Sequence, residues 1–188
     1  MTVELRPLDA AAAGAAAAWL AAEENAKWLD FGRGVRSPGE LALRLMAQHS
    51  LHALRVYAAA GGPPIGIVAL SDIDRAFGSA TLWYVLGDKR EAGRGCTTLA
   101  AQALLRHAFD ELGLRSVQAW AVATNRPSIR VLEKCHFRLI GRRRQCHVVD
   151  GAACDRLLFD VLRGELAARG AYRASSRTSQ FTENNAST

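Results

Sequence analysis

Residues 82–113 read LWYVLG, DKREAGRGCTT and LAAQALLRHAFDELG in succession, and this stretch decides the fold. Its first six residues are mostly apolar and rich in aromatic and β-branched types, which predicts a strand that ends at Gly87. Apolar residues recur at helical spacing from Ala101 to Leu112, and Gly113 is a suitable C-cap. The stretch therefore predicts a strand, a glycine-rich turn and a helix, in that order.

The turn contains the sequence Arg90-x-x-Gly93-Arg94-Gly95. Glycine allows backbone N–H groups to converge on an anion at the positive end of a helix dipole, and arginine adds a mobile cation. The turn accordingly predicts a phosphate site, although many such turns use glycine for packing and bind nothing. A P-loop is excluded because no Gly-Lys-Ser/Thr follows, and a dinucleotide fingerprint is excluded because Thr98 stands where a third glycine is needed.

The register of this turn, which begins five residues after Val85, resembles the pyrophosphate-binding segment of the GNAT acetyltransferase superfamily. A second stretch, residues 124–137 (TNRPSIRVLEKCHF), resembles the N-x-x-S-x-x-V-L-E-K-x-G-F segment of the same superfamily, in the form used by its ribosomal-protein N-terminal acetyltransferase branch. Two motifs in the right order are more specific than either one. The resemblance covers about residues 1–163, with one departure, since His136 stands where the family has glycine.

The element order follows from the hydrophobic pattern without the resemblance. Expected strands lie at about 2–8, 51–60, 65–73, 82–86, 114–123, 137–149 and 153–162. Expected helices lie at about 9–24, after the start signal at Ser37, from the first turn at Thr97 and Thr98 to Leu112, and after the cap at Asn125. This order predicts an α/β (α+β) sandwich on a mixed, mostly antiparallel sheet of about seven strands with about four helices, which is also the order of a GNAT-like fold. We expect Ser37 to cap the second helix, and Leu41, Leu45 and Met46 to form its buried face.

The length and composition favour one domain. With 188 residues and 49% apolar residues, the chain can bury one core. We assign residues 1–163 to this single domain. Residues 164–188 are rich in Ala, Arg, Ser, Thr and Asn, and we expect a disordered C-terminal tail.

The formal net charge of +6 raises the question of a nucleic-acid partner. The densest basic cluster is Arg142-Arg143-Arg144, and no long basic helix or aromatic-interleaved basic face accompanies it. A solvated strand edge, or a rim that attracts a polyanionic coenzyme, explains this cluster equally well. A nucleic-acid partner is therefore not expected.

Cysteine spacing and hydropathy indicate the cellular compartment in which we expect the protein. The four cysteines are Cys96, Cys135, Cys146 and Cys154. They show no C-x-x-C spacing, so we expect reduced thiols and no metal. The alanine-rich run at 10–22 lacks a long Leu/Val/Ile core and leads into Glu23-Glu24, which favours a helix capped by Asp9 over a signal peptide. We expect a cytoplasmic protein that is a monomer or homodimer and has no membrane partner.

The resemblance implies acetyl-CoA as the acetyl donor, with no metal. It implies that the main chain of the strand binds the pantetheine arm and that the turn and the second motif hold the rest of the coenzyme. The residues it assigns to coenzyme binding are Trp83, Tyr84, Val85, Arg90, Gly93, Arg94, Gly95, Cys96, Thr97 and Asn125.

The resemblance also suggests a proton donor for the leaving thiolate. Many family members use a tyrosine that corresponds to Leu132 here, whereas the ribosomal-protein branch uses a serine at the place of Ser128. Ser128 could equally serve only to cap the short helix. No general base is assigned, because Asp72 and Asp74 could act through water or could simply form the turn in which they lie.

The acceptor is expected to be a primary amine. The resemblance places Trp28 and Phe31 in the acceptor pocket, although each could be an ordinary core aromatic. We favour a small-molecule acceptor, such as an amino sugar, a polyamine or an antibiotic, over a protein N-terminus of the ribosomal type. A non-catalytic acyl-CoA-binding module is a third reading.

Overall fold

The computed structural model describes residues 2–32, 35 and 37–166. The expected tail beyond Leu166 therefore lies outside the described residues. The strands are β1 (Val3–Pro7), β2 (Ala53–Ala59), β3 (Pro64–Asp74), β4 (Ser79–Leu86), β5 (Ser116–Val122), β6 (Arg138–Val149) and β7 (Ala152–Leu162). They form a seven-stranded sheet in the order β1-β2-β3-β4-β5-β7-β6. Every neighbouring pair is antiparallel except β4 and β5, so the predicted mixed, mostly antiparallel sheet is confirmed.

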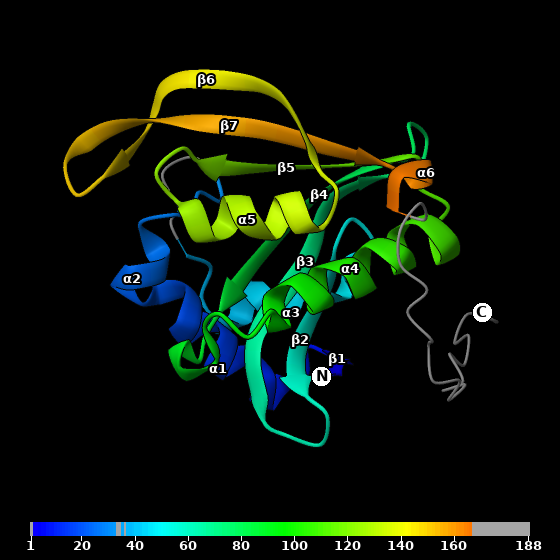
Figure 1. Cartoon of the computed structure of the whole chain (residues 1–188). Coiled ribbons are helices and arrows are strands. Elements are labelled where there is room, and N and C mark those ends of the chain that lie inside the picture. Colours follow the sequence, from blue (N-terminus) through cyan, green and yellow to red (C-terminus); the bar gives the residue numbers. More distant parts are fainter. Residues whose placement is uncertain (1, 33–34, 36, 167–188) are drawn as a thin grey trace.

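The four predicted helices are present as α1 (Ala10–Ala21), α3 (Glu40–Gln48), α4 (Cys96–Arg106) and α5 (Arg126–Lys134). Two further helices, α2 (Glu23–Ala26) and α6 (Arg163–Leu166), have four residues each, too few to produce a hydrophobic period. A 3₁₀ turn, η1 (Lys89–Glu91), precedes α4, and a π-helical segment, η2 (His107–Glu111), continues it. Figure 1 shows the long β6–β7 hairpin beyond β5.

The sheet is covered by helices on both faces. One face packs against α4 and α5 through residues such as Leu70, Leu82 and Leu104. The other face packs against α1 and α3 through residues such as Leu54, Val85 and Leu43. The molecule is thus a three-layer sandwich with two apolar clusters, as expected for an α/β fold.

Local capping explains where several elements begin. The Asp9 carboxylate accepts a hydrogen bond from the Ala12 N–H at 2.8 Å, which confirms its N-cap role. Asp150 and Gly151 both have positive φ, at 50° and 79°, as a type I′ hairpin turn between β6 and β7 requires. His136 has φ 64°, so it adopts the left-handed conformation that usually favours glycine.

The prediction for α3 is wrong in two respects. The helix begins at Glu40 with Gly39 as its N-cap, and no side chain caps it, so Ser37 has no capping role. Leu41 and Leu45 are 69% and 58% exposed, and the face at i, i+3 and i+4 that packs inward is Leu43, Met46 and Ala47. Leucines lie on both sides of this helix, so the pattern alone did not identify the side that α1 covers.

Strands β4 and β5 are paired over only part of their length. The parallel pairing joins Ser79–Thr81 to Ser116–Gln118 and then stops. Strand β3 continues to pair with β4 as far as Leu86, and β7 continues to pair with β5 as far as Val122. From Leu82 onward, the edge of β4 that faces β5 therefore has no strand partner within the described residues.

Tyr57 connects three elements that surround the unpaired edge of β4. Its fully buried hydroxyl lies 3.3 Å from the Val85 carbonyl oxygen and 2.9 Å from the Thr97 hydroxyl, so it joins β2, β4 and the first turn of α4. Gly66 on β3 makes room for it, because a Cβ at Gly66 would collide with the Tyr57 hydroxyl and the Val85 carbonyl.

We expect Gly66→Ala to destabilise the fold by about 2–3 kcal/mol, since neither the buried ring nor the backbone can move away. Gly141→Ala is the matched control, because a Cβ there would meet its nearest atom at 3.6 Å, an ordinary contact. Urea denaturation of both variants measures the difference. Equal stability of the two would contradict this packing argument.

Candidate functional site

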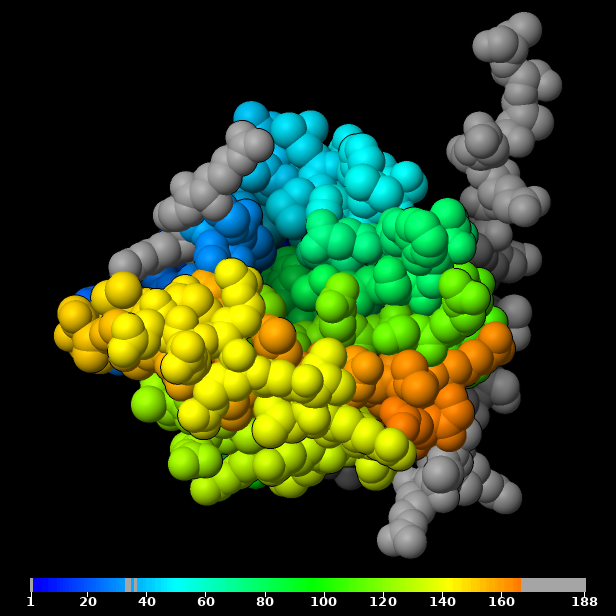
Figure 2. Space-filling view, turned by 90° about the horizontal axis from the view of Figure 1, so that it is seen from above, coloured from blue at the N-terminus to red at the C-terminus, as the bar shows by residue number. Residues whose placement is uncertain are grey.

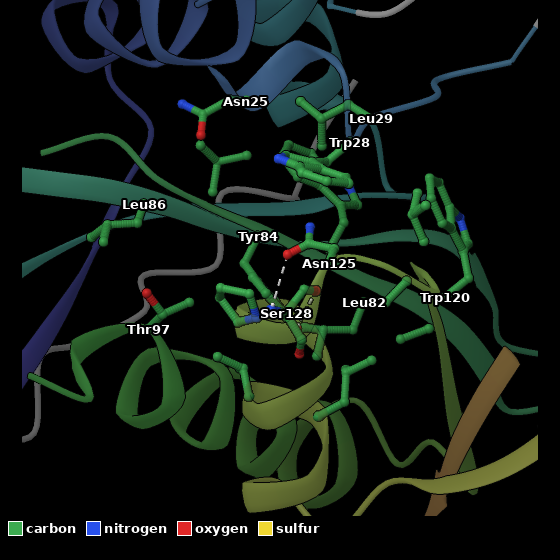
Figure 3. Close-up of a pocket in the computed structure, with 18 of the residues that line it drawn as sticks. Asn25, Trp28, Leu29, Leu82, Tyr84, Leu86, Thr97, Trp120, Asn125 and Ser128 are labelled. Atoms are coloured by element: carbon green, nitrogen blue, oxygen red, sulfur yellow. Dashed lines mark hydrogen bonds between the residues drawn. The ribbon is translucent and has the colours of Figure 1, made fainter. Parts of the chain in front are cut away.

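A cavity of about 910 Å³ lies where β4 and β5 separate. Its walls come from β4, β5, the end of β3, the turn before α4, α5, and residues within 24–32. Figure 3 shows Thr97 and Leu86 toward one end and Trp120 toward the other, with Tyr84, Asn125 and Ser128 between them. Figure 2 shows the surface hollowed between the blue and cyan segments and the yellow hairpin, with green atoms at its floor.

The glycine-rich turn lines one end of the cavity. Gly93 and Gly95 have φ values of 79° and 81°, and a Cβ at either position would project into open space. Gly95 is the N-cap of α4, and it offers no side chain to that helix end. Glycine at these positions therefore permits the left-handed backbone and leaves the helix N-terminus open to an anionic group. The geometry fits the phosphate end of the coenzyme that the resemblance implies.

The two arginines of the turn do not line the cavity. The Arg90 side chain is 89% exposed and pairs with the Asp88 carboxylate at 2.8 Å, while Arg94 pairs with Glu91 at 3.2 Å. The Asp88 hydrogen bond raises the pKa of Arg90, so its charge is retained. Exposed pairs of this kind contribute little to stability, so a more favourable anion could displace the carboxylates.

The cation that lines this end of the cavity is Lys89, and neither Arg90 nor Arg94 lines it. Its ammonium donates to the Asn25 side-chain oxygen and, at 2.7 Å, to the Leu86 carbonyl oxygen. Burial lowers the pKa of Lys89, and the Glu24 carboxylate opposes that shift. Neither Lys89 nor Asn25 was a predicted site residue, because their contact joins residues 64 positions apart and leaves no local pattern.

The unpaired edge of β4 forms the middle of the cavity. The lining includes the expected Trp83, Tyr84 and Val85, together with the flanking Leu82 and Leu86. Gly93, Gly95, Cys96 and Thr97 line the same cavity, as does Asn125 across from them on the α5 side. The structure thus brings together all of the predicted coenzyme residues except the two arginines.

Ser128 lies in the first turn of α5, where its N–H donates to the Asn125 side-chain oxygen at 3.3 Å. The cap is therefore Asn125, and the Ser128 hydroxyl is not needed for it. Tyr84 reaches the same residue from β4, with its hydroxyl 2.9 Å from the Ser128 carbonyl oxygen and 3.0 Å from Ser128 Oγ. When Tyr84 donates to the carbonyl, Ser128 Oγ–H donates to Tyr84 Oη.

Burial raises the pKa of Tyr84 well above its usual range, so its hydroxyl remains protonated. The tyrosine can then orient Ser128 without exchanging a proton with solvent at neutral pH. No local pattern indicates this contact, since the two residues are 44 positions apart.

Aromatic side chains line the other part of the cavity. Trp28 and Phe31 are half-buried and both line it, as expected. Phe31 packs edge-to-face on Trp83 with ring centroids 5.1 Å apart, and the Trp83 indole N–H donates to Ser71 Oγ at 2.7 Å. The Trp83 side chain therefore belongs to this aromatic wall, in addition to the main-chain role predicted for it.

A polar network in which Arg156 and His147 are buried and Asp30 is partly exposed supports the same wall. The Arg156 guanidinium donates to the Asp30 carboxylate at 2.5 Å and to His147 Nδ1 at 2.8 Å, and it stacks 4.0 Å from the Trp120 ring centroid. Because Nδ1 accepts, His147 carries its hydrogen on Nε2, which donates to the Lys27 carbonyl oxygen at 2.8 Å. The hydrogen bond from Arg156 lowers the pKa of Asp30. The network joins β6 and β7 to the loop after α2.

The predicted alternatives for Asp74 and Asp72 separate in the structure. Asp74 accepts a hydrogen bond from the Phe77 N–H at 2.9 Å, so it forms the turn. Asp72 lines the cavity, has φ 52°, and accepts no hydrogen bond from the described residues.

All four cysteines are described and none is in a disulfide. Within the described ranges, no cluster of three or more potential metal ligands occurs, and no helix is long and apolar enough to cross a membrane.

Comparison with known proteins gives a family match and structural neighbours. A model described as an acetyltransferase (GNAT) domain matches residues 2–138. The chain is 31% identical over 103 residues to an uncharacterized N-acetyltransferase, p20, of Bacillus licheniformis, a match that covers 55% of this chain and 57% of that protein. The chain thus spans less than two thirds of that curated relative.

Two solved structures have the same fold. RimJ of Mycobacterium smegmatis, in complex with CoA-disulfide, matches with a TM-score of 0.72 and 26% identity, covering 88% of this chain and 84% of that one. Spermidine N-acetyltransferase of Vibrio cholerae, in complex with CoA and spermine, matches with a TM-score of 0.76 over 87% of this chain and 97% of that one. At 17% identity, the second likeness concerns the fold alone.

We expect Arg156→Ala to destabilise the protein by about 2 kcal/mol, because it leaves the buried His147 Nδ1 without its partner and uncovers the Trp120 ring. Arg142→Ala is the matched control on the same hairpin, since its 3.5 Å pair with Asp155 is exposed and should contribute less than about 1 kcal/mol. Chemical denaturation compares the two variants. Similar losses of unfolding free energy in both variants would show that the network around Arg156 stabilises the protein no more than the exposed pair does.

Proposed function

Because the chain belongs to the GNAT acetyltransferase family, we propose that it transfers the acetyl group of acetyl-CoA to the primary amine of a small molecule, with residues 1–163 as the acetyltransferase domain. The observation that carries this proposal is the continuity of the cavity. A glycine turn suited to phosphate, an unpaired strand edge and an aromatic wall follow one another along it.

The open edge of β4 suits a ligand with amide groups along an extended arm. Backbone N–H and C=O groups that lack a partner in an apolar setting are unfavourable, and an added strand-like ligand satisfies them. The pantetheine arm of acetyl-CoA has such amides, and its diphosphate lies at the far end. Acetyl-CoA supplies the acyl group and a thiol leaving group. The edge at 82–86 and the turn at 93–97 would hold these two parts.

Ser128 is the proposed proton donor. Its hydroxyl lies at the cavity between the strand edge and α5. When the Tyr84 hydroxyl donates to Ser128 Oγ instead of the Ser128 carbonyl oxygen, the Ser128 O–H is free to donate to the leaving sulfur. A thiolate with an ordinary pKa near 8.5 needs only a weak acid. Tyr84 is a positioning residue here, since its raised pKa prevents it from losing a proton at neutral pH.

The aromatic wall supports a small acceptor with an apolar body. Trp28, Phe31 and Trp83 offer ring faces and edges to such a molecule. The Asp30 carboxylate is already paired with Arg156, and the Trp120 face is covered by the same guanidinium. A polycationic acceptor would meet few unpaired carboxylates there, so an amine on an apolar or aromatic body is favoured over a polyamine.

A protein N-terminus is the second candidate, favoured by the resemblance of residues 124–137 to the ribosomal-protein N-terminal acetyltransferase branch. Incubation of the full chain with acetyl-CoA and a panel of acceptors, followed by measurement of free thiol, separates the candidates. The panel holds arylalkylamines, polyamines, amino sugars and short peptides with free N-termini. Thiol release with the apolar amines supports the proposal, and release only with peptides supports the second candidate. Binding of acetyl-CoA with no thiol release for any acceptor would contradict the claim that the protein is an enzyme.

We expect Gly95→Asp to weaken acetyl-CoA binding by on the order of 100-fold, because it introduces a carboxylate at the helix N-terminus that should bind phosphate. Gly61→Asp is the matched control, since Gly61 has φ 72° and open space around its Cβ but lies in the β2–β3 turn. Both variants carry the same backbone strain. Calorimetric titration of each with acetyl-CoA measures the effect, and equal affinities would remove the role assigned to the turn.

We expect Ser128→Ala to lower kcat by about 100-fold while the affinity for acetyl-CoA stays within about twofold. Tyr84→Phe should lower kcat less, and the double variant should be no slower than Ser128→Ala, because the tyrosine acts through the serine. Steady-state kinetics of the three variants forms the test. Additive losses would show that Tyr84 has a separate role.

A further inference from the structure

One buried polar atom stands apart from the rest. Among the buried side-chain nitrogen and oxygen atoms of the described residues, only His52 Nδ1 has no hydrogen-bond partner. More than about 90% of such groups in proteins are paired, and an exception needs a physical explanation. A half-buried histidine with an orphaned nitrogen is unfavourable for folding, so its presence in a cavity wall points to a role in that cavity.

The strand register places His52 on the acceptor side. Leu54, Ala69 and Trp83 are aligned across β2, β3 and β4, on the face covered by α1 and α3. Side chains two residues apart along a strand share a face. His52 therefore lies on this face beside Ser71 and Thr81, which are themselves paired. It lines the same cavity as Phe31 and Trp83, whereas Ser128 lies on the opposite side with α5.

Acetyl transfer to an amine requires a proton acceptor on this side. A lysine-like amine has a pKa of about 10.4 and arrives as an ammonium ion, which cannot attack a carbonyl carbon. Two of the nearby carboxylates already have partners, because Asp30 pairs with Arg156 and Asp74 accepts a hydrogen bond from the Phe77 N–H within its turn. Imidazole is a better base near pH 7 than an ordinary carboxylate.

We propose that His52 is the general base that deprotonates the acceptor ammonium. In the tautomer with hydrogen on Nδ1, the Nε2 lone pair is available, and it has no partner among the described residues. The ammonium N–H bond breaks as the Nε2–H bond forms, which leaves a neutral amine and an imidazolium. The inference rests on the proposed function, because only an amine acceptor needs this step.

The charges around His52 favour this cycle. Burial lowers the pKa of His52 below its usual 6.5, and the neighbouring His49 lowers it further. The Asp72 carboxylate acts in the opposite direction and stabilises the imidazolium once it has formed. Asp72 is held at the β3 bulge with φ 52°, a conformation uncommon outside glycine. His52 is therefore neutral at pH 7, and it becomes protonated and inactive as the pH falls through its lowered pKa.

The test compares His52→Gln and His52→Leu with the wild-type chain. At pH 7 we expect kcat to fall by about 100-fold or more in both, with acetyl-CoA affinity within about twofold. In the wild type, kcat rises with pH through a midpoint below 6.5, and this limb should disappear in the variants. An acceptor amine whose pKa lies below 7 needs no base, so the variants should acetylate it nearly as fast as the wild type.

Stability and a neighbouring histidine provide controls. His52→Leu removes the orphaned nitrogen and should raise Tm by about 2–4 °C, while His52→Gln serves if the leucine variant does not fold. His49→Leu is the matched control, since the two rings lie 6.0 Å apart and His49 does not line the cavity. Its kcat at pH 7 should stay within about twofold of wild type, while the low-pH midpoint should rise because His49 no longer lowers the pKa of His52.

The outcomes distinguish this inference from the proposed function. Slow His52 variants that recover with the low-pKa amine support the inference. Variants that retain wild-type kcat and the low-pH limb overturn it while the acetyltransferase activity stands. Variants that lose activity equally with both classes of amine also overturn it, since the residue would then be structural. A wild-type chain that acetylates no amine overturns the proposed function itself.

Discussion

The structure depends on the early end of the pairing between β4 and β5. Three residue pairs join the strands, and beyond Thr81 they separate, so the sheet contains an unsatisfied backbone edge within its own interior. An unpaired edge is unfavourable in an apolar core, and natural sheets normally cover it. Here the separation persists because each strand is held firmly on its other side, β4 by β3 and β5 by β7. The cavity is a consequence of that geometry.

The parts around the opening are held by long-range contacts. Tyr57 links β4 to the first turn of α4, Tyr84 links β4 to α5, and Arg156 links the β6–β7 hairpin to the loop after α2. Each contact buries polar groups that would be costly to leave unpaired, so the walls have few alternative arrangements. A preformed cavity of this kind lowers the ordering cost of binding a long, flexible ligand.

The sequence was sufficient wherever the signal is local. The strand, turn and helix at 82–113 and the Asp9 cap depend on neighbouring residues, and the structure confirms them. It failed for α3, where leucines lie on opposite faces and only the packing against α1 selects Leu43. No local sequence pattern indicated a role for Lys89, for His52 or for the network around Arg156. Those features join residues far apart in the chain, up to 126 positions for Arg156 and Asp30.

The central claim is that the open edge of β4 is completed by the arm of acetyl-CoA. Amide hydrogen exchange of residues 82–86, measured with and without acetyl-CoA, tests it most directly because it reports on the backbone itself. The account predicts that exchange at this edge and at 93–98 slows when the coenzyme is added, while exchange in β1 is unchanged. Binding that leaves exchange at 82–86 unaltered would contradict the account.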